Sequence, residues 1–471
     1  MTLRLIAALA GLTALSGCAT TPVNFPAKIA APDSWRAQPH VLRKPMSKNQ
    51  DDEWWQQLAD PELNRLVALA LAENSDIRIA SVRVLRARAL RAGTVAEQRP
   101  SLSSNLEVRR ERVPETRIRD ADGVSARIPP YHRNQVSYQV IEASYEIDLF
   151  GRLALAAQAS GAELLATEAE HRAVRQRVAY EVVVAYADIL LAQTLSPQAQ
   201  HALEFVTALL AAEQSKQAAG LSTLMSVRTV EDELATAHEA LINIERSRNL
   251  NRARLALILG QVSSEFAPPA TGIYFASIPN SGAIEVDLPT AVLDQRPDVD
   301  AAWHKVIAST TEAAQVRLEK YPKFTLTGNI GLSGILRRWL TGDALGWLLG
   351  ATVQGPLFDG GRGQARTDAA SAIAIERQVE YRKVVLQALH EVEAALTEAT
   401  HAQQKLSIAE STVQRRVADA ANTSNLLHQG AADRLALLRA ELARIDAIQL
   451  ATTRRHDLFL AWASVQKALG R

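Results

Sequence analysis

The sequence is poor in cysteine, methionine and aromatic residues. Its 471 residues include one cysteine, Cys18, with three methionines and 5% aromatic side chains. A single cysteine excludes an intrachain disulfide and any metal site built from several cysteines of one chain. The ten histidines are scattered, and none has the His-Glu-x-x-His spacing of zinc hydrolases. No catalytic constellation is visible, so we expect neither an enzyme nor a bound metal or other cofactor.

The sequence also lacks a strong net charge and long apolar runs. Lysine and arginine number 52 against 51 acidic residues, a formal charge of +1, which argues against a general nucleic-acid binder. Beyond the N-terminal segment there is no uncharged apolar run of about 18 residues, so we expect no membrane-spanning helix in the mature chain. The 47% hydrophobic content is nevertheless enough for a large core.

The first 17 residues have the pattern of a lipoprotein signal peptide. Arg4 precedes an apolar stretch at 5–15, and two small residues then lead to Cys18. This ending resembles the bacterial lipoprotein box, which implies that Cys18 carries covalent lipid, such as palmitate, and becomes the first mature residue. Ala19 in the next position resembles lipoproteins sent to the outer membrane. A plain secretory signal with an incidental cysteine is the alternative.

Residues 18–51 predict an extended strap that leads from the lipid anchor to the folded body. They show little apolar periodicity and contain five prolines, whose fixed φ disfavours a helix. Folded structure is expected from residue 52 onward. Asp60 followed by Pro61 is a typical helix start, with the aspartate as N-cap and the proline as first helical residue.

The chain contains an internal repeat. Residues 151–260 predict one very long helix, a tight turn at Gly220 and a helix running back, and residues 361–470 repeat the pattern with an offset of 210. Glycine at each turn supplies the positive φ that ends a helix in a sharp reversal. The matched pairs are Arg152 and Arg362, Gly220 and Gly430, Glu231 and Glu441, Leu259 and Leu469, and Gly260 and Gly470.

The predicted helices carry apolar seams spaced alternately by three and four residues, which is typical of coiled coils. One seam follows Gly220 and another precedes it, and an ordinary antiparallel coiled coil remains the alternative interpretation. The seam residues are Val178, Val182, Ala185, Ile189 and Ala192, then Val227, Val230, Leu234, Ala237, Leu241 and Ile244.

The predicted lengths fit a tube. A helix over 152–219 would be roughly 100 Å long, and two shorter helices of about 40 residues placed end to end would match it. The irregular segments near Ser196-Pro197, at 261–294 and around Asp51 are therefore expected to gather at mid-height as a girdle.

The front of each repeat matches with an offset of 222 instead of 210. The second copy is therefore twelve residues shorter than the first over the interval that corresponds to Pro100–Arg152. This interval is the β part. Period-two alternation predicts two β-hairpins, at about 100–149 and 322–358, with loops at 113–133 and 334–345. A phase slip between Val140 and Ile141 suggests a bulge. The pairs with the 222 offset are Asp76 and Asp298, Val84 and Val306, Glu97 and Glu319, and Pro100 and Pro322.

The number of strands decides the interpretation. Two hairpins give four strands of about ten residues, the length that crosses a bilayer when tilted. Four strands cannot close a barrel, and open edges are not tolerated in lipid. Three chains would give twelve strands, with apolar side chains facing lipid and Thr, Asn, Ser and Glu facing a wet lumen.

Two further motifs have ordinary interpretations. Gly360-Gly361-Arg362-Gly363 follows a strand without a P-loop lysine, so we interpret it as a strand-to-helix corner. Five arginines at the outer end of the first hairpin are positioned to meet lipopolysaccharide phosphates, although a generic soluble loop is the favoured interpretation. They are Arg109, Arg110, Arg112, Arg117 and Arg119.

With these residues in view, the chain resembles the TolC-type outer membrane factors, in particular the NodT-type efflux lipoproteins. The resemblance spans about residues 15–470 and depends on motifs that are specific in combination. These motifs are Trp54-Trp55, Asp60-Pro61-Glu62-Leu63, Ala70-Leu71-Ala72-Glu73-Asn74, Tyr145-Glu146-Ile147-Asp148-Leu149-Phe150-Gly151-Arg152, Asp294-Gln295-Arg296-Pro297-Asp298-Val299 and Phe358-Asp359-Gly360-Gly361-Arg362.

The resemblance implies a mainly α fold with membrane β: four strands per protomer in a 12-stranded trimeric barrel, continued by a periplasmic α-helical coiled-coil barrel. It implies a homotrimer in the outer membrane lipid, docked by a periplasmic membrane fusion protein (adaptor) that connects it to an inner membrane pump. Docking is implied for the helix turns, named here tip 1 (217–223) and tip 2 (428–434). The candidate docking residues are Gly220, Leu221, Gly430 and Ala431.

The gate residues of the family match this sequence less well than the docking residues do. Many relatives close the lower pore with acidic residues just after the second tip, but this chain has Ala436 and Arg439 at those places, so an acidic ring is not supported. We hypothesise that Asp433 pairs with an arginine across subunits and holds the tip closed. A solvated, charged helix face is the alternative. The candidate gate residues are Asp433, Arg434 and Arg439.

The expected function is a passive exit duct of a tripartite RND-type efflux system for drugs or other small molecules. The alternatives are the exit duct of a type I secretion or metal-ion efflux system, and a lipid-anchored periplasmic coiled-coil scaffold without a pore. The predicted organisation is a signal peptide (1–17), a strap (18–51), repeat 1 (52–260), an inter-repeat equatorial segment (261–295) and repeat 2 (296–471).

Overall fold

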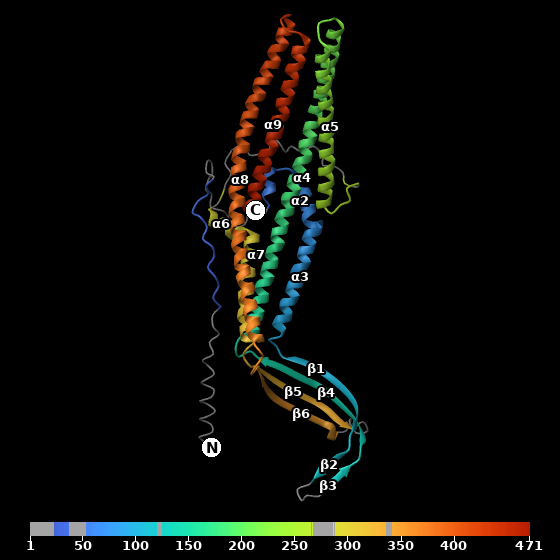
Figure 1. The fold of residues 1–471 in the computed structure, drawn as a ribbon, viewed down its shortest axis with the longest axis vertical. Helices are drawn as coiled ribbons and strands as arrows, with labels where there is room; N and C mark the ends of the chain where they lie inside the picture. Colours follow the sequence, from blue (N-terminus) through green and yellow to red (C-terminus); the bar gives the residue numbers. More distant parts are fainter. Residues whose placement is uncertain are drawn as a thin grey trace. The chain divides into compact units, whose positions relative to one another are not determined.

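The computed structural model describes residues 23–36, 53–119, 125–264, 266, 286, 288–335 and 342–471 (Figure 1). The predicted signal peptide, Cys18 and most of the inter-repeat segment lie outside the described residues. The chain forms two compact units. The first combines Met1–Ala27, Leu85–Ala166 and Trp303–Glu380 and holds all the described strands, whereas the second is helical and combines Lys28–Val84, Thr167–Ala302 and Tyr381–Arg471.

The helices confirm the internal repeat. Each long helix and each returning helix has a counterpart of the same length at the offset of 210, and the helices before the first strand of each repeat match at 222. The pairs are α4 (Arg152–Ala218) and α8 (Arg362–His428) with 67 residues each, α5 (Leu224–Ile258) and α9 (Arg434–Ala468) with 35 each, and α3 (Ser75–Ala96) and α7 (Pro297–Leu318) with 22 each.

The glycines that end these helices have the backbone conformation that the sequence predicts. Gly220 and Gly430 have φ of 72° and 74°, and Gly260 and Gly470 have φ of 70° and 80°. Residues with a side chain are strained in this left-handed region, so glycine is the residue that reverses the chain here. The remaining helical segments are short: η2 (Trp54–Leu58), α2 (Pro61–Glu73), α6 (Pro289–Gln295) and η4 (Gly342–Ala344).

One expected irregularity is wrong, because α4 runs without a break through Pro197. A proline inside a helix removes one backbone hydrogen bond and costs about 3 kcal/mol. Around it, however, Ala192 and Ala199 are buried, so tertiary packing on the helix outweighs the local preference. Ser196-Pro197 therefore does not contribute an irregular segment to a girdle.

The second unit has an apolar core centred on α4. The first predicted seam is fully buried there, including Val178, Val182 and Ile189 at 0% exposure. The packed partners come from η2, α2, α5 and α9 and include Trp54, Leu63, Leu66, Leu255 and Phe459. By length and composition α4 is apolar enough to cross a membrane, but 56% of its most apolar window is buried inside the chain, as in a core helix.

The start of α2 has the predicted cap and a further buried contact. The carboxylate of Asp60 accepts hydrogen bonds from the backbone N–H groups of Glu62 and Leu63, at 2.9 and 3.1 Å. Its other oxygen accepts a hydrogen bond from the hydroxyl of Tyr186 on α4 at 3.0 Å. Burial raises the pKa of Tyr186, and the nearby Asp60 charge raises it further. The helix cap therefore also fixes α2 against α4.

The described part of the strap, residues 23–36, has no helix or strand. Trp35 is buried in a second apolar cluster that includes Val392 and Val465. The backbone N–H of Arg36 donates to the carboxylate of Glu393 at 2.7 Å. This stretch is therefore held against α8 by an apolar side chain and a charge-assisted hydrogen bond.

In the first unit, four strands form an antiparallel sheet in the order β1-β4-β5-β6. They are β1 (Ser101–Val113), β4 (Tyr131–Ile147), β5 (Lys323–Ile335) and β6 (Leu345–Gln354). The predicted bulge is confirmed: Gln139 pairs with Gly331 and Ile141 with Ile330, which leaves Val140 as an extra residue. The two predicted hairpins are therefore joined side by side through β4 and β5.

The loop expected at 113–133 is partly wrong. It contains a second two-stranded sheet, β2 (Thr116–Arg119) and β3 (Ser125–Ile128), which continues the first hairpin beyond β1 and β4 (Figure 1). Its strands are only four residues long, with the sequences Thr-Arg-Ile-Arg in β2 and Ser-Ala-Arg-Ile in β3. So short a pattern resembles a polar loop in the sequence, and the cross-strand pairing supplies the order.

Replacing Gly260 with alanine should destabilise the protein more than the same change at Gly220. Both glycines have φ near 70°, which costs an alanine roughly 1–2 kcal/mol. A Cβ at Gly260 would also lie 2.9 Å from the carbonyl oxygen of Glu73, whereas one at Gly220 would meet nothing within 4 Å. The measurement is the midpoint temperature of thermal unfolding, monitored by the helical signal in circular dichroism. Equal shifts for both variants would contradict the close packing of Gly260 on α2.

Candidate functional site

The four-stranded sheet has one apolar and one polar face. Directly paired residues of neighbouring strands point to the same face, so the register defines rows that cross all four strands. One apolar row is Leu106, Tyr138, Leu332 and Leu345; one polar row is Ser101, Ser144, Thr327 and Gly350. The sheet therefore has the two-sided character of a membrane barrel wall.

The apolar face is strongly exposed in the single chain. Leu102 is 72% exposed, and Trp347 and Leu349 are each 79% exposed. Large apolar side chains on a contiguous face are costly in water and require lipid or a partner. Each of these three residues lies on an edge strand of the sheet.

The two edges of the sheet are open. Among the described residues, β1 pairs only with β4 and β6 pairs only with β5. Each edge thus presents a row of backbone N–H and C=O groups without a strand partner. In a hydrocarbon environment such groups need a partner strand.

The two tips have the same backbone design. At tip 1 the N–H of Gly220 donates to the carbonyl of Gln217 at 3.0 Å, and the N–H of Leu221 donates to that of Lys216 at 2.8 Å. At tip 2 Gly430 and Ala431 make the equivalent bonds to Leu427 and Leu426, at 3.0 and 2.8 Å. These are Schellman-type helix ends, which satisfy the last carbonyls of each helix.

The two tips differ in their side chains. Leu221 is 78% exposed, and Leu224 and Met225 just after it are also exposed. At tip 2 the matching position is Ala431, and Arg434 begins the following helix. Tip 1 therefore presents an apolar surface, whereas tip 2 presents small and charged side chains.

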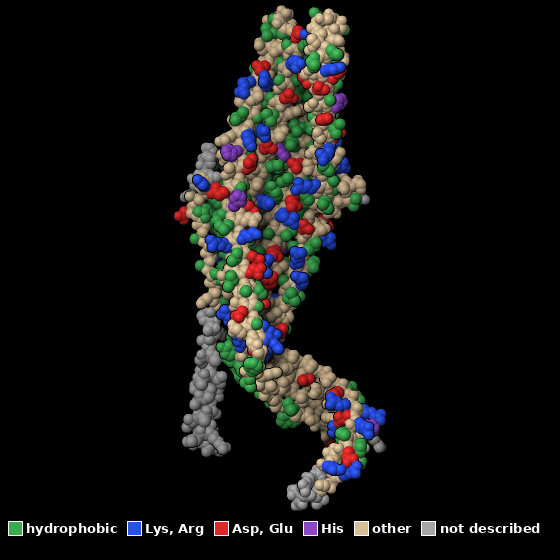
Figure 2. Space-filling view, viewed as in Figure 1, with side chains coloured by type: hydrophobic (Ala, Val, Ile, Leu, Met, Phe, Trp, Pro, Cys, Tyr) green, Lys and Arg blue, Asp and Glu red, His purple; other side chains and the backbone are tan. Residues whose placement is uncertain are grey.

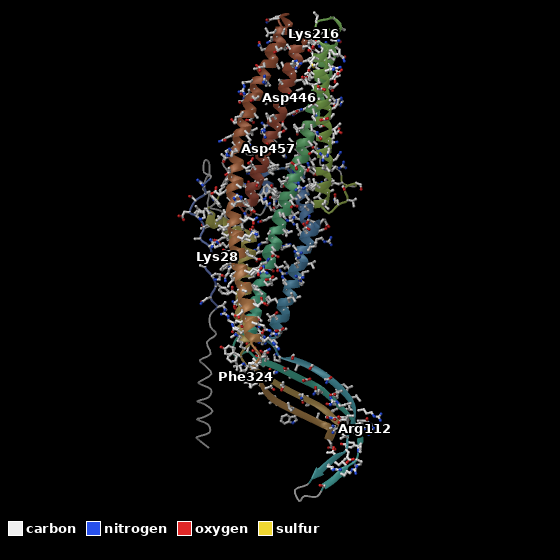
Figure 3. The ribbon with its side chains drawn as sticks, in the orientation of Figure 1. Lys28, Arg112, Lys216, Phe324, Asp446 and Asp457 are labelled. Atoms are coloured by element: carbon white, nitrogen blue, oxygen red, sulfur yellow. The ribbon has the colours of Figure 1, made fainter. Side chains whose placement is uncertain are left out.

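Asp433 caps α9 and joins the two tips. One carboxylate oxygen accepts a hydrogen bond from the N–H of Ala436 at 2.8 Å, and the other accepts one from the ammonium of Lys216 on α4 at 2.7 Å. Figure 3 labels Lys216 near this end of the long helices. These two donors lower the pKa of Asp433 below its ordinary value. Thr223 occupies the same position at tip 1 and accepts the N–H of Ser226, without a charge.

A second ion pair links the helices that follow the tips. The guanidinium of Arg439 on α9 lies 3.7 Å from the carboxylate of Glu233 on α5. On the same helices, Val230 of α5 and Leu438 of α9 pack together with Leu209 of α4 in a small buried cluster. Arg434, the third candidate gate residue, is exposed.

Sequence reasoning missed Lys216 and Glu233. Neither stands out by spacing, because each lies on a different helix from its partner and far from it in the chain. Within the chain, Asp433 is paired with a lysine. The expected pairing with an arginine of another subunit concerns the assembled protein and stays a prediction.

The glycine-rich segment is confirmed as a strand-to-helix corner. The carboxylate of Asp359 accepts the N–H groups of Gly361 and Gly363, at 2.9 and 2.6 Å, and these bonds lower the pKa of Asp359. The side chain thus takes the place that a bound anion has in a P-loop. Among the described residues, no group of three or more His, Cys, Asp or Glu is placed to hold a metal ion.

The comparison with known proteins agrees with this geometry. A family model described as "Outer membrane efflux protein" matches residues 66–261 and 288–471. The pyoverdine export outer membrane protein OpmQ of Pseudomonas aeruginosa is 25% identical over 398 residues, covering 84% of this chain and 81% of that protein. The outer membrane protein OprJ of the same organism is 28% identical over 395 residues, covering 81% and 78%.

Solved structures share the fold. The outer-membrane channel OprN superposes with a TM-score of 0.81 at 24% identity, over 96% of this chain and 99% of that one. The outer membrane channel CmeC of Campylobacter jejuni also gives a TM-score of 0.81, at 18% identity, over 96% and 94%. The TolC-like fold expected from the sequence is confirmed, and the family match in both repeats shows that the chain belongs to the outer membrane efflux proteins.

Proposed function

We propose that three copies of this chain close a twelve-stranded barrel in the outer membrane and act as the passive exit duct of a tripartite RND-type efflux pump. The observation that carries the proposal is the four-stranded sheet with two open edges and one exposed apolar face. In lipid the edges need strand partners, and the smallest single-chain barrels have eight strands. Two further copies of the same sheet satisfy both requirements.

The direction of the edge strands supports closure between copies. β1 runs away from α3, and β6 runs back toward α8, so the β1 of one copy and the β6 of the next are antiparallel when placed side by side. The polar face, which carries Ser, Thr, Asn and Glu, then lines a wet lumen. Small molecules diffuse through it, and the energy for transport comes from the inner membrane pump.

The anchor and the docking surface complete the proposal. Lipid on Cys18 would hold the N-terminus in the outer membrane in addition to the barrel. A periplasmic adaptor would bind the tips, where the exposed side chains of Leu221, Leu224 and Met225 offer apolar surface for burial. The ion pairs of Asp433 with Lys216 and of Arg439 with Glu233 would keep the tips together until the adaptor engages.

Cysteine pairs across the proposed seam should produce covalent trimers. Ser103→Cys on the polar face of β1 is combined with a cysteine at Gly350, Thr352 or Gln354 on the polar face of β6, and membranes are oxidised. We expect at least one of the three combinations to give a trimer band on non-reducing gels, because directly opposed residues of adjacent strands lie about 5 Å apart.

The matched control combines Ser103→Cys with Ala351→Cys, which points to the other face of β6. This pair should stay monomeric, as should the parent chain with Cys18 alone. Failure of all three polar-face combinations to give trimers would contradict closure through these edges.

Removing the Lys216–Asp433 ion pair should open the duct. Lys216→Ala leaves the cap on Ala436 intact, and Asp433→Asn keeps a capping side chain but loses the charge. We expect each variant to raise single-channel conductance in planar bilayers and the entry of large antibiotics, with a double variant no more open than either single one. An exposed pair is worth about 0–1 kcal/mol, so the rise should be severalfold at most.

The pH dependence follows from the lowered pKa of Asp433. The contact is complete above the ordinary aspartate pKa of about 4 and is lost as the pH falls through the lower folded pKa. Wild-type conductance should therefore rise only in that acid range.

The control for the Lys216→Ala and Asp433→Asn variants is Arg416→Ala, which removes an ion pair within α8. Unchanged conductance and antibiotic entry in both tip variants would show that Asp433 is not a gate residue.

A charge at tip 1 should weaken adaptor binding more than the same charge at tip 2. Leu221→Asp removes an exposed apolar side chain whose burial is worth about 1.5–3 kcal/mol, so about tenfold or more weaker binding is expected. Ala431→Asp at the matching position loses only a methyl group. The measurements are adaptor binding to purified trimers and drug susceptibility at equal protein levels. An equal loss at both tips would contradict the apolar docking surface of tip 1.

A further inference from the structure

The apolar face of β1 becomes basic near its outer end. Even-numbered residues of this strand share one face, and Leu106 and Val108 are followed on it by Arg110 and Arg112. Figure 2 shows charged side chains gathered at this end of the sheet, and Figure 3 places Arg112 there, at the end opposite Phe324. The change from apolar to basic occurs within one strand and on one face.

The neighbouring strand adds two polar side chains to the same face. Asn134 of β4 pairs with Arg110, and His132 pairs with Arg112. Along a strand these positions are about 7 Å apart, and across the pair they are about 5 Å apart. All four side chains are exposed. Together they form a patch of nitrogen donors, named here the basic patch.

The arginines of the opposite face are neutralised. Arg109 lies 2.6 Å from Glu107, and Arg133 pairs with Glu111, all on odd-numbered positions. Beyond the strand, Arg127 pairs with Glu115. By contrast, no described carboxylate lies within ion-pair distance of Arg110 or Arg112. The face that carries the apolar rows therefore also carries the uncompensated positive charge.

The height of the basic patch on the sheet matches the edge of a membrane. At the end near the helices, Phe324 packs with Phe150, which contacts Tyr321, at centroid distances of 6.3 and 4.9 Å. From Phe324 to Leu332 the β5 strand rises about 26 Å, or about 20 Å along the barrel axis when tilted by about 40°. This is close to the apolar band of about 25 Å in outer-membrane barrels.

Two aromatic side chains near the outer end lie below the basic patch on the same face of the sheet. Tyr138 is in the row of Leu332, and Trp347 pairs with Ile330, on the same apolar face. Tyr and Trp favour the level where hydrocarbon gives way to headgroups. Arg110 and Arg112 are four and six residues beyond Leu106, and therefore lie at the headgroup level.

We propose that the basic patch binds the phosphate of a phosphorylated glycolipid of the outer leaflet, lipid A, while the apolar rows beneath it contact the acyl chains. The proposal rests on the proposed function, because it needs the sheet in the outer membrane with its apolar face to lipid. Arginine forks match phosphate oxygens in a bidentate geometry. A ligand that covers both the patch and the adjoining apolar rows must carry phosphate and acyl chains in one molecule.

The test uses the purified trimer in detergent and bisphosphorylated lipid A as the probe. The double variant Arg110→Gln/Arg112→Gln should bind lipid A about tenfold or more weakly, because two charge-assisted contacts are lost. Arg109→Gln, next in sequence but paired on the opposite face, should bind as the wild type does. Lipid A without phosphates should bind the wild type as weakly as bisphosphorylated lipid A binds the double variant, and inorganic phosphate at the same concentration should not compete.

Three results would overturn the site: unchanged lipid A binding in the double variant, an equal loss in Arg109→Gln, or full competition by inorganic phosphate. Conductance in phosphatidylcholine bilayers tests the proposed function separately, and the double variant should conduct like the wild type. A wild type that conducts but binds lipid A independently of these arginines rejects the basic patch alone. A wild type that binds lipid A through them but does not conduct rejects the duct alone.

Discussion

The backbone hydrogen bonds at the two edges of the sheet are the constraint on which the rest of the structure depends. β1 and β6 each satisfy one side only, and their side chains include Leu102, Trp347 and Leu349, which are exposed in the single chain. Water would tolerate the edges but not the apolar face, and lipid would tolerate the face but not the edges. The proposed association with further copies would supply partners for the edges, and the closed sheet could then place its apolar face in lipid, so folding of the sheet and assembly would be coupled.

The internal repeat keeps the lengths of the helices constant while the hairpins vary. α4 and α8 have 67 residues each, and α5 and α9 have 35 each, although few residues are identical between the copies. Helices that share one packed wall must end at the same level, so an insertion in one would displace its turn and its cap. The twelve extra residues of the first repeat lie instead in the hairpin, where β2 and β3 extend it without moving the strands below. The helices therefore have the same length in both copies, because the packing around them requires it.

The sequence predicted the features that repeat or alternate. The helix pairs, the glycine turns, the N-cap at Asp60, the four-stranded sheet and the bulge at Val140 all follow from periodicity or from residues with a special backbone preference. It failed where tertiary contacts override local chemistry. α4 continues through Pro197 because its neighbours are buried, and Asp433 is paired with Lys216, which no spacing indicates because the two residues are far apart in the chain. Side-chain pairs between distant helices become visible only in three dimensions.

The two copies of the repeat carry different side chains at both of their ends, which is where different partners are expected to bind. Thr223 and Asp433 cap equivalent helices, but only Asp433 carries a charge, and it pairs with Lys216 on a helix of the other repeat. At the matching turns, the exposed Leu221 of tip 1 corresponds to Ala431 of tip 2. At the other end, the first hairpin places Arg110 and Arg112 above its apolar rows, whereas β5 has Gly334 beyond Leu332 on the same face. The backbone that both copies share builds the wall, and the side chains in which they differ give each end its own chemistry.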